Sequence, residues 1–552
     1  MINEFDPIGL GILWDRLISI TDEILAALVR TSFSTIVRES YDLSCVLLDP
    51  DGNSLAQGTY SVPSFTGTAS PTIRHILRKY PPDTLQPGDV IITNDPWLGT
   101  GHLFDINVMR PVFRRRQLVG YTMSITHLPD IGGKGFSATS TAVYEEGLRL
   151  PICKLANAGK LNGELLELIR TNVRVEELVI GDLMATITCN EVGERLLVEF
   201  MNEYGIDELV PLSKAIIGQS EQTMREEIKK MPDGVYENDI KVEATAEEAV
   251  TLSCQVKISG DTVHIDFDGT SPAVIGGVNV PICCTKAFAA YAIKCITTPS
   301  IPNNEGSVKP ITISAPEGCI LNAQPPSPTA GRHTVGHFVT PLVFGALTKA
   351  IPELIQADCG MFTLMNFQGK RADGKDVSNI YFSSGGFGAV NGLDGASTTP
   401  GPSNMTGTPI EIWEDLTNLT IEKKELLPNS GGPGKYRGGL GQNIVIRNDS
   451  KHFMIISCFA QRTEFPPLGA NGGKPGKLRK YWINGKEMPP KGRYVLKPGD
   501  EIKLHEAGGG GYGDPNERLL NEVLEDVKNG FVTIDGALHG YGVKVNLERL
   551  DV

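Results

Sequence analysis

Hydrophobic and polar positions follow two different periods along this chain of 552 residues. In residues 7–38, apolar side chains recur every three or four positions with charged ones between them, a spacing that predicts one long amphipathic helix. Residues 160–230 contain few glycines and predict a second helical stretch. Residues 234–270 instead alternate apolar and polar positions, which indicates strands with one buried face.

Short apolar runs bounded by turn residues predict strands and hairpins nearer the N-terminus. Residues 41–58 predict a hairpin that turns at an Asp-Pro-Asp-Gly segment. Residues 90–93 predict a buried strand, which stops at Pro96 because proline cannot donate to a strand ladder. Residues 111–125 predict a second hairpin, turning near Arg115. Further helices are predicted at residues 286–297, 339–350 and 516–530.

The fold class follows from this mixture of periods. The chain is too long for one ordinary core, so two to four structural units are expected. Its 61 glycines and 36 prolines indicate many turns and a strand-rich protein. We therefore expect an α+β fold with three regions. They are an N-terminal α/β metal-binding region at 1–230, a mixed central region at 231–400, and a β-rich, glycine-turn region with a short terminal helix at 401–552.

The composition argues against some classes of binding partner and indicates the cellular compartment. A net charge of −14 argues against nucleic acid as a ligand. No apolar run reaches about 18 residues, which argues against a membrane span. The acidic first seven residues do not fit a signal peptide. The ten cysteines are scattered and form no CxxC pair, so we expect no zinc knuckle and a location in the reducing cytoplasm.

Three polar islands, at residues 38–42, 94–105 and 126–130, carry the candidate chemistry. Two imidazoles with carboxylates suit a borderline divalent metal such as Zn²⁺ or Mn²⁺. Two of the nine histidines fall in these islands, each with an aspartate three residues later. The alternative interpretation is that the aspartates cap loops and the histidines are buried with satisfied nitrogens, and both interpretations stay open. The candidate ligands are Asp42, His102, Asp105 and His127.

A second cluster, residues 331–337, lies between a proline-rich loop and an apolar helix. Arg332 and His333 at a helix N-terminus could hold an anionic group. The alternative, that His333 and His337 cap and pack the loop, is slightly favoured.

Three glycine-rich segments suggest phosphate binding at first sight, but none has the required context. Neither the GxxxxGK[ST] loop followed by a helix nor the strand-GxGxxG-helix unit is present. We therefore expect no nucleotide site in this chain, and predict tight turns or close backbone packing there. A GxSxG serine-hydrolase elbow is also missing from the sequence. The segments are residues 431–439, 472–476 and 508–513.

The islands and the glycine segments together resemble the hydantoinase B/oxoprolinase family over nearly the whole chain. The length is similar to that of the stand-alone B-type chains of N-methylhydantoinase and caprolactamase. No single segment is specific to this family, but the whole set of segments in this order is. The segments that carry the resemblance are residues 33–42, 93–102, 126–127, 266–272, 302–306, 431–439 and 508–518.

The resemblance implies a reaction shared between two subunits. An A-type ATPase partner would bind ATP and phosphorylate the substrate oxygen, and the B-type chain would hold a metal and complete the reaction. The implied assembly is an (αβ)2 heterotetramer. The implied ion is Zn²⁺, with Mn²⁺ or Fe²⁺ as alternatives. The family's metal ligands match Asp42, His102, Asp105 and His127.

The expected function is hydrolysis of a C–N bond in a cyclic amide: a hydantoin, a lactam or 5-oxoproline. Asp130 or Glu39 is the expected group that orients or deprotonates water. The alternatives are a component of an ATP-dependent ketone carboxylase and a non-catalytic scaffold for the ATPase. Two departures from the family are Tyr41, where a charged or small residue is common, and His337, where relatives often carry glutamine. No role is therefore carried over to the second cluster.

Overall fold

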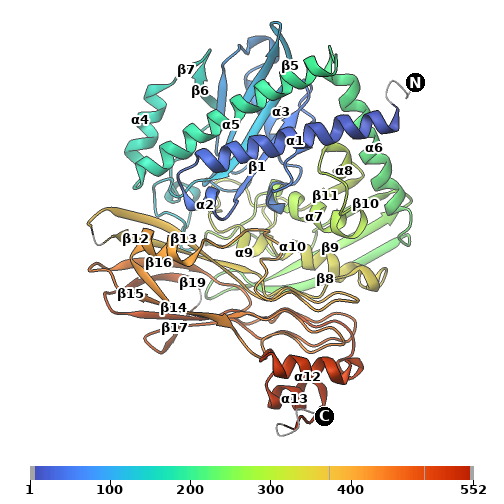
Figure 1. Cartoon of the computed structure of the whole chain (residues 1–552), viewed down its shortest axis with the longest axis vertical. Helices are drawn as coiled ribbons and strands as arrows, with labels where there is room; N and C mark the ends of the chain where they lie inside the picture. The colour runs from blue at the N-terminus through green and yellow to red at the C-terminus, as the bar shows by residue number, and fades with distance from the viewer. Residues whose placement is uncertain (1–5, 372, 490, 547–552) are drawn as a thin grey trace.

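The computed structural model describes residues 6–371, 373–489 and 491–546, and it confirms the α+β prediction (Figure 1). Its largest sheet has seven strands in the order β2-β1-β5-β4-β3-β6-β7. This sheet holds both predicted N-terminal hairpins. Its strands are β1 (Leu43–Leu48), β2 (Ser54–Gln57), β3 (Val90–Thr93), β4 (Asp105–Arg114), β5 (Gln117–His127), β6 (Cys153–Asn157) and β7 (Lys160–Leu161).

The predicted N-terminal helix is two helices. Helix α1 (Pro7–Thr31) packs with α5 (Glu176–Glu203) over the sheet, as Figure 1 shows, and α2 (Thr35–Arg38) follows a short extended segment. The break has a local cause. The Asp182 carboxylate on α5 accepts hydrogen bonds from the backbone N–H groups of Phe33 and Ser34, at 2.7 and 3.1 Å. These N–H groups are therefore satisfied without a continuous helix.

The second hairpin is longer than predicted. Strands β4 and β5 extend to Asp105 and His127, which face each other as a cross-strand pair. The turn between the strands contains Arg115 and Arg116 with φ of 53° and 69°. Asp105 and His127, which lie outside the predicted hairpin at 111–125, are therefore part of the sheet itself, at the same end of the hairpin.

The helical stretch at 160–230 is confirmed, and a second sheet follows it. That sheet has the order β11-β10-β9-β8, with β10 and β11 parallel. Helix α10 packs against β8 and β9, and also against α7. The elements are α4 (Gly163–Asn172), α6 (Leu209–Ile228), β8 (Gly234–Glu243), β9 (Ala249–Ser259), β10 (Thr262–Asp266), α7 (Ile282–Thr297), α8 (Glu305–Val308), β11 (Ile311–Ser314), α9 (His333–Gly336) and α10 (Val339–Leu347).

Two further sheets form the lower part of the molecule in Figure 1 and share one apolar core. Their orders are β13-β12-β16-β19 and β14-β15-β20-β17-β18. The division of the chain at residues 230 and 400 stays a prediction. The elements are β12 (Phe362–Lys370), β13 (Asp376–Ser384), α11 (Ile410–Thr417), β14 (Leu419–Leu426), β15 (Gln442–Asn448), β16 (Met454–Phe459), β17 (Lys480–Ile483), β18 (Lys486–Met488), β19 (Lys491–Leu496) and β20 (Glu501–His505).

The glycine-rich segments run side by side in contact through their backbones, which confirms the prediction of close packing (Figure 1). A Cβ atom on Gly386 would lie 1.8 Å from the carbonyl oxygen of Gly439, and one on Gly508 would lie 1.9 Å from that of Ser430. Backbone hydrogen bonds link the segments, for example from Gly432 to Gly509 at 2.8 Å. Only glycine permits this approach, because any other residue places a carbon where a neighbouring carbonyl lies.

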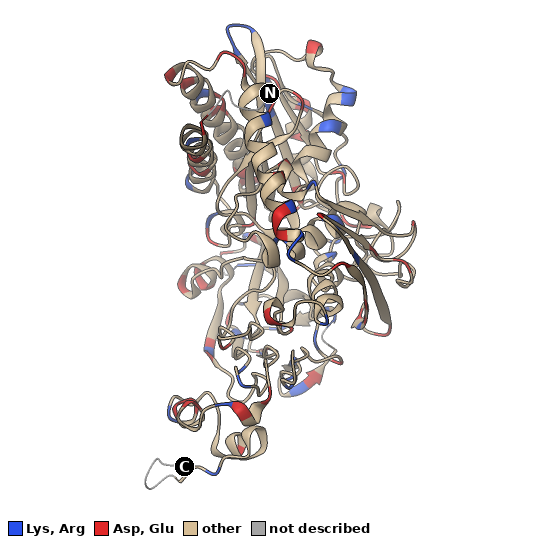
Figure 2. Cartoon of the chain, turned by 90° about the vertical axis from the view of Figure 1, so that its right-hand side faces the viewer, with Lys and Arg blue, Asp and Glu red and all other residues tan. Residues whose placement is uncertain are grey.

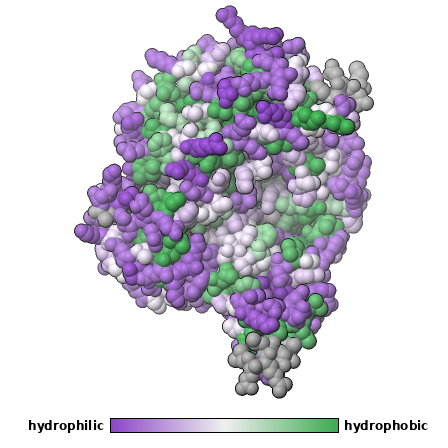
Figure 3. Space-filling model, in the orientation of Figure 1, coloured by the Kyte–Doolittle hydropathy of each residue, from purple (hydrophilic) through white to green (hydrophobic). Residues whose placement is uncertain are grey.

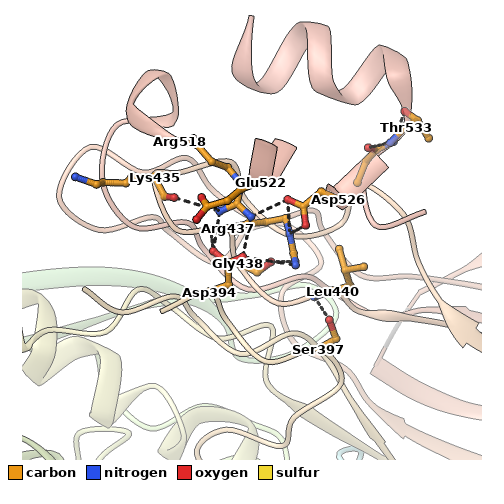
Figure 4. A network of polar contacts seen from close by, with 11 residues as sticks. Asp394, Ser397, Lys435, Arg437, Gly438, Leu440, Arg518, Glu522, Asp526 and Thr533 are labelled. Carbon is orange, nitrogen blue, oxygen red and sulfur yellow. Dashed lines mark hydrogen bonds and ion pairs between the residues drawn. The ribbon is translucent and has the colours of Figure 1, made fainter. Parts of the chain in front are cut away.

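The C-terminal helices α12 (Leu520–Lys528) and α13 (Ile534–Tyr541) project from one end of the molecule (Figures 1 and 2). The predicted helix at 516–530 begins later, because a 3₁₀ turn, Pro515–Glu517, precedes it. An ion network, buried except at Asp394, ties α12 to the glycine segments (Figure 4). Arg518 pairs with Asp394 at 2.7 Å and with Asp526 at 2.8 Å, and Arg437 pairs with Asp526 at 3.2 Å.

The surface carries charges of both signs. Lysines and arginines are interspersed with aspartates and glutamates along the molecule in Figure 2, and polar residues cover much of the face in Figure 3 with apolar ones scattered among them. Among the helices of the described residues, none is long and apolar enough to cross a membrane.

Candidate metal centre

His102, Asp105 and His127 form one buried group. One potential ligand atom from each lies within 4.8 Å of the others, and the residues are 2%, 1% and 3% exposed. The topology explains the convergence. Asp105 begins β4 and His127 ends β5, so the register of the hairpin sets them opposite each other, and His102 lies in the loop that enters β4.

The hydrogen bonding of His102 favours a cation in this group. Its Nδ1 lies 3.0 Å from the carbonyl oxygen of Ala330, so we assign the proton to Nδ1 and a lone pair to Nε2. That Nε2 lies 2.8 Å from Asp105 Oδ1, and neither atom has a hydrogen-bond partner within the described residues. Two acceptors at this distance repel each other unless a proton or a metal ion lies between them. The donor set of two imidazoles and a carboxylate fits a divalent ion.

The second oxygen of Asp105 is held by Arg332. The guanidinium donates to Asp105 Oδ2 and to the carbonyl oxygen of Thr100, both at 2.7 Å. Gly101 makes room for it, because a Cβ there would lie 2.6 Å from Arg332 Cδ. Gly101 also has a φ of 100°, which side chains rarely adopt. Arg332 thereby fixes the orientation of the carboxylate.

The electrostatics of the group suit metal ligation. Burial lowers the pKa of His127 to about 3, aided by His102 and Arg332, and burial with Arg332 also lowers the pKa of His102. Burial opposes the ionisation of Asp105, but the Arg332 guanidinium beside it favours the carboxylate, and the pKa of this carboxyl lies below its usual range. At neutral pH the imidazoles are therefore neutral and Asp105 is ionised, the protonation states that a metal requires of its ligands.

Asp42 lies in the wall of the same cavity, although it is not within the three-residue group. Its backbone carbonyl accepts a hydrogen bond from the N–H of His127 at 3.2 Å. The preceding residue, Tyr41, has a φ of 55°, the left-handed conformation that a tyrosine adopts only when its surroundings impose it. Burial and the neighbouring Asp105 raise the pKa of Asp42 to about 8, and Arg332 opposes this rise. A cation beside Asp42 would lower its pKa.

The cavity beside the group is small and has two kinds of wall. Its volume is about 40 Å³, a few times the roughly 10–15 Å³ that one water molecule requires on the same measure. The candidate ligands and Arg332 form the polar wall. Ser403 and Met405 also line it, on a segment whose Thr406 N–H donates to the carbonyl oxygen of Ser40. The other wall is aromatic: Phe136, Phe288, Phe362 and Phe382.

Neither expected general base reaches the cavity. The Asp130 carboxylate accepts hydrogen bonds from the backbone and guanidinium of Arg174, at 2.5 and 2.6 Å, and from Gly132 N–H at 3.1 Å, so it anchors a loop. Glu39 follows α2, and its backbone carbonyl accepts a hydrogen bond from the Thr406 hydroxyl. Neither side chain is among the residues that line the cavity, so the geometry gives no support to their assignment as bases.

The second cluster lines the same cavity, and its histidines are also packed among aromatic side chains. Arg332, His333 and His337 all line the cavity, although their segment is 227 residues or more beyond Asp105. The Arg332 guanidinium is engaged by Asp105 and Thr100, so it is not free to hold an anion as the sequence suggested. The four-residue spacing of the histidines was the signal in the sequence, because it puts both on one helix face.

Comparisons with known proteins point to one family. A family model described as hydantoinase B/oxoprolinase matches residues 6–515. The chain is 31% identical to a putative B-type component of a D-/L-hydantoinase from Pseudomonas sp. (strain NS671), and the match covers 100% of this chain and 97% of that protein. It is 30% identical to the beta chain of the Pseudomonas jessenii caprolactamase, over 99% of this chain and 97% of that one.

Solved structures show the same fold. The ATP-dependent caprolactamase from Pseudomonas jessenii matches with a TM-score of 0.91 and 27% identity, over 99% of this chain and 98% of that one. A nucleotide-free acetone carboxylase matches with a TM-score of 0.89 over 98% of this chain and 80% of that one, and at 20% identity it shows the fold alone. Since the family model spans nearly the whole sequence, this chain belongs to the hydantoinase B/oxoprolinase family.

Proposed function

We propose that this chain is the metal-holding component of an ATP-dependent cyclic-amide hydrolase. The buried His102–Asp105–His127 group beside a cavity is the observation that carries the proposal. The relatives named as a hydantoinase and a caprolactamase support the substrate class. We propose Asp42 as a fourth ligand and Zn²⁺ as the ion, with Mn²⁺ or Fe²⁺ as alternatives, because mixed nitrogen and oxygen ligands suit all three.

The chemistry begins from the inertness of an unstrained amide, whose carbonyl is stabilised by resonance. Phosphorylation of the amide oxygen by the partner makes the carbon electrophilic. A divalent ion supplies Lewis acidity, which lowers the pKa of water from 15.7 to about 7. Within this chain, His102, Asp105 and His127 would hold the ion and Arg332 orients Asp105. The phenylalanine wall excludes bulk water, which strengthens the electrostatic interactions inside the cavity.

An A-type ATPase is the proposed partner, in an (αβ)2 complex of the cytoplasm. The names of the two relatives describe each as one component of a larger enzyme, and the caprolactamase structure is described as ATP-dependent. The glycine segments of this chain are used for backbone packing. The nucleotide would therefore bind to the partner. Co-purification followed by an ATPase screen over hydantoins, lactams and 5-oxoproline tests this assignment.

The test of the metal site is His102→Ala in the complete complex. The variant should lose stoichiometric metal and ring opening, whereas ATP hydrolysis by the partner should persist in part. Metal content by mass spectrometry and product formation are the two readouts. His539→Ala is the matched control, because that imidazole lies on α13 with a side chain 73% exposed.

Three other outcomes would decide between functions. Full metal content and full turnover by His102→Ala would contradict the proposal. A wild-type protein without stoichiometric metal would favour the scaffold alternative. A bicarbonate requirement with carbon incorporated into the product would favour a carboxylase.

A further inference from the structure

Two histidines that line the cavity each have a buried ring nitrogen without a hydrogen-bond partner among the described residues. His333 and His337 are 7% and 3% exposed, and both line the cavity beside the candidate metal group. Nε2 of His333 and Nδ1 of His337 are buried and have no hydrogen-bond partner within the part of the chain that the structure describes. Most buried polar groups are paired in folded proteins, so two unpaired nitrogens among the residues that line one cavity are candidate groups for binding a ligand.

The local structure holds these rings together. They are four residues apart across the short helix α9, so they share one face, and their ring centroids lie 5.6 Å apart. Phe136 stacks on His333 at 5.7 Å, and Phe362 contacts both rings at 5.9 and 5.7 Å. Burial and Arg332 lower the pKa of His337 to about 3, and burial and His337 hold the pKa of His333 well below its usual range. Each neutral ring therefore offers one N–H donor and one lone pair.

The charge of the cavity restricts what these rings can bind. Arg332 is the one lysine or arginine among the described residues that line the cavity. Its guanidinium already donates to Asp105 and to the carbonyl oxygen of Thr100, both at 2.7 Å. A ring that carries a carboxylate would therefore find no unclaimed cationic side chain among the described residues that line the cavity. The aromatic wall instead suits a flat, uncharged ring.

We propose that His333 and His337 hydrogen-bond the edge of the substrate ring that lies away from the bond to be opened, and so select cyclic ureides over plain lactams. This inference rests on the proposed function. A cyclic ureide such as hydantoin presents a C=O acceptor and an N–H donor on that edge, which complement one N–H and one lone pair of the imidazoles. A plain lactam presents only methylene groups there, which would leave the ring nitrogens unpaired.

The test compares kcat/KM of the complete complex for hydantoin, 2-pyrrolidinone and 5-oxoproline. The wild-type complex should prefer hydantoin. His333→Leu and His337→Leu should each lower the hydantoin-to-pyrrolidinone ratio of kcat/KM at least tenfold, mainly through KM for hydantoin. His337→Gln should restore much of the ratio, because an amide keeps both a donor and an acceptor. His539→Leu on the exposed face of α13 is the control and should leave the ratio unchanged.

The hydantoin-to-pyrrolidinone ratio of kcat/KM distinguishes a loss of substrate recognition from a folding defect. A merely structural defect lowers the activity on hydantoin and on 2-pyrrolidinone together. An unchanged ratio in both leucine variants, or a wild-type preference for 5-oxoproline, would overturn the inference and leave the proposed function standing. Loss of metal from the leucine variants would also overturn it, because the histidines would then be ligands. A wild-type complex that opens none of these rings would overturn the proposed function as well.

Discussion

Arg332 is the residue that joins the candidate metal group to the histidine pair. It holds Asp105 through one nitrogen and is followed directly by His333. It is also 5% exposed, so its charge is offset within the site and not by solvent. A change that displaces this side chain is expected to disturb the orientation of Asp105 before it disturbs the fold.

Gly101→Ala tests whether Arg332 fixes the orientation of Asp105, because it adds one methyl group next to the Arg332 side chain. The new Cβ would lie 2.6 Å from Arg332 Cδ, at a backbone φ of 100° that alanine adopts only with strain. We expect metal affinity to fall at least tenfold and the free energy of unfolding to fall by about 1–3 kcal/mol. Metal titration and denaturant unfolding are the measurements. Gly163→Ala is the matched control, because a Cβ there meets nothing within 4 Å. Unchanged metal affinity would show that Arg332 does not fix Asp105.

At the scale of elements, the site depends on the segment that leads into α9. Glu146 accepts hydrogen bonds from the backbone N–H groups of Thr329 and Ala330, at 3.0 and 2.9 Å. The carbonyl oxygen of the same Ala330 receives the proton of His102 Nδ1. A buried carboxylate therefore positions the segment that orients a candidate ligand.

The ionisation of the Glu146 carboxyl should make the stability of the protein depend on pH. Burial raises its pKa from 4.5 to about 7, although the two backbone N–H groups oppose the rise. Between these values the folded protein keeps a proton on Glu146 that the unfolded chain has released, so the contribution of Glu146 to the free energy of unfolding should fall as the pH rises from 4.5 to about 7. The denaturant midpoint of the wild type should fall relative to that of Glu146→Gln across this range, because the comparison cancels the buried histidines, whose lowered pKa values make stability rise with pH in both proteins. Equal slopes would contradict the assignment.

At the scale of the whole molecule, the glycine segments connect the sheets to the C-terminal helices. Their backbones contact each other directly, and Arg437 and Arg518 then tie α12 to them (Figure 4). The lower half of the molecule therefore contains a core of peptide groups beside its apolar core. Such a core tolerates no side chain.

Gly386→Ala should be among the most destabilising single changes in the chain. Its Cβ would lie 1.8 Å from the carbonyl oxygen of Gly439, and a backbone atom cannot rotate away. We expect a loss of more than about 3 kcal/mol, measured as a shift of the denaturant midpoint or as insolubility. Gly407→Ala is the control, because a Cβ there meets nothing within 4 Å. A small effect at Gly386 would show that the segments can separate without cost.

Much of the fold could be predicted from local pattern. The strand at Val90–Thr93, the helical stretch at 160–230 and the close packing of glycine segments follow from periodicity and residue type, which depend on neighbours in sequence. The break between α1 and α2 could not be predicted, because Asp182, about 150 residues away, satisfies the N–H groups of Phe33 and Ser34. The surroundings of Asp130 could not be predicted for the same reason, since Arg174 binds its carboxylate.

The sequence by itself determined which residue types are available for a metal site and, through the two histidine–aspartate spacings and the family resemblance, which residues to consider. The tertiary structure decided which of them meet. The register of β4 and β5 brings His127 to Asp105, and the fold adds Arg332, His333 and His337 from a distant segment. The physical reason is that spacing acts only within one helix or strand, whereas burial, charge pairing and hydrogen-bond satisfaction depend on what the rest of the chain brings alongside.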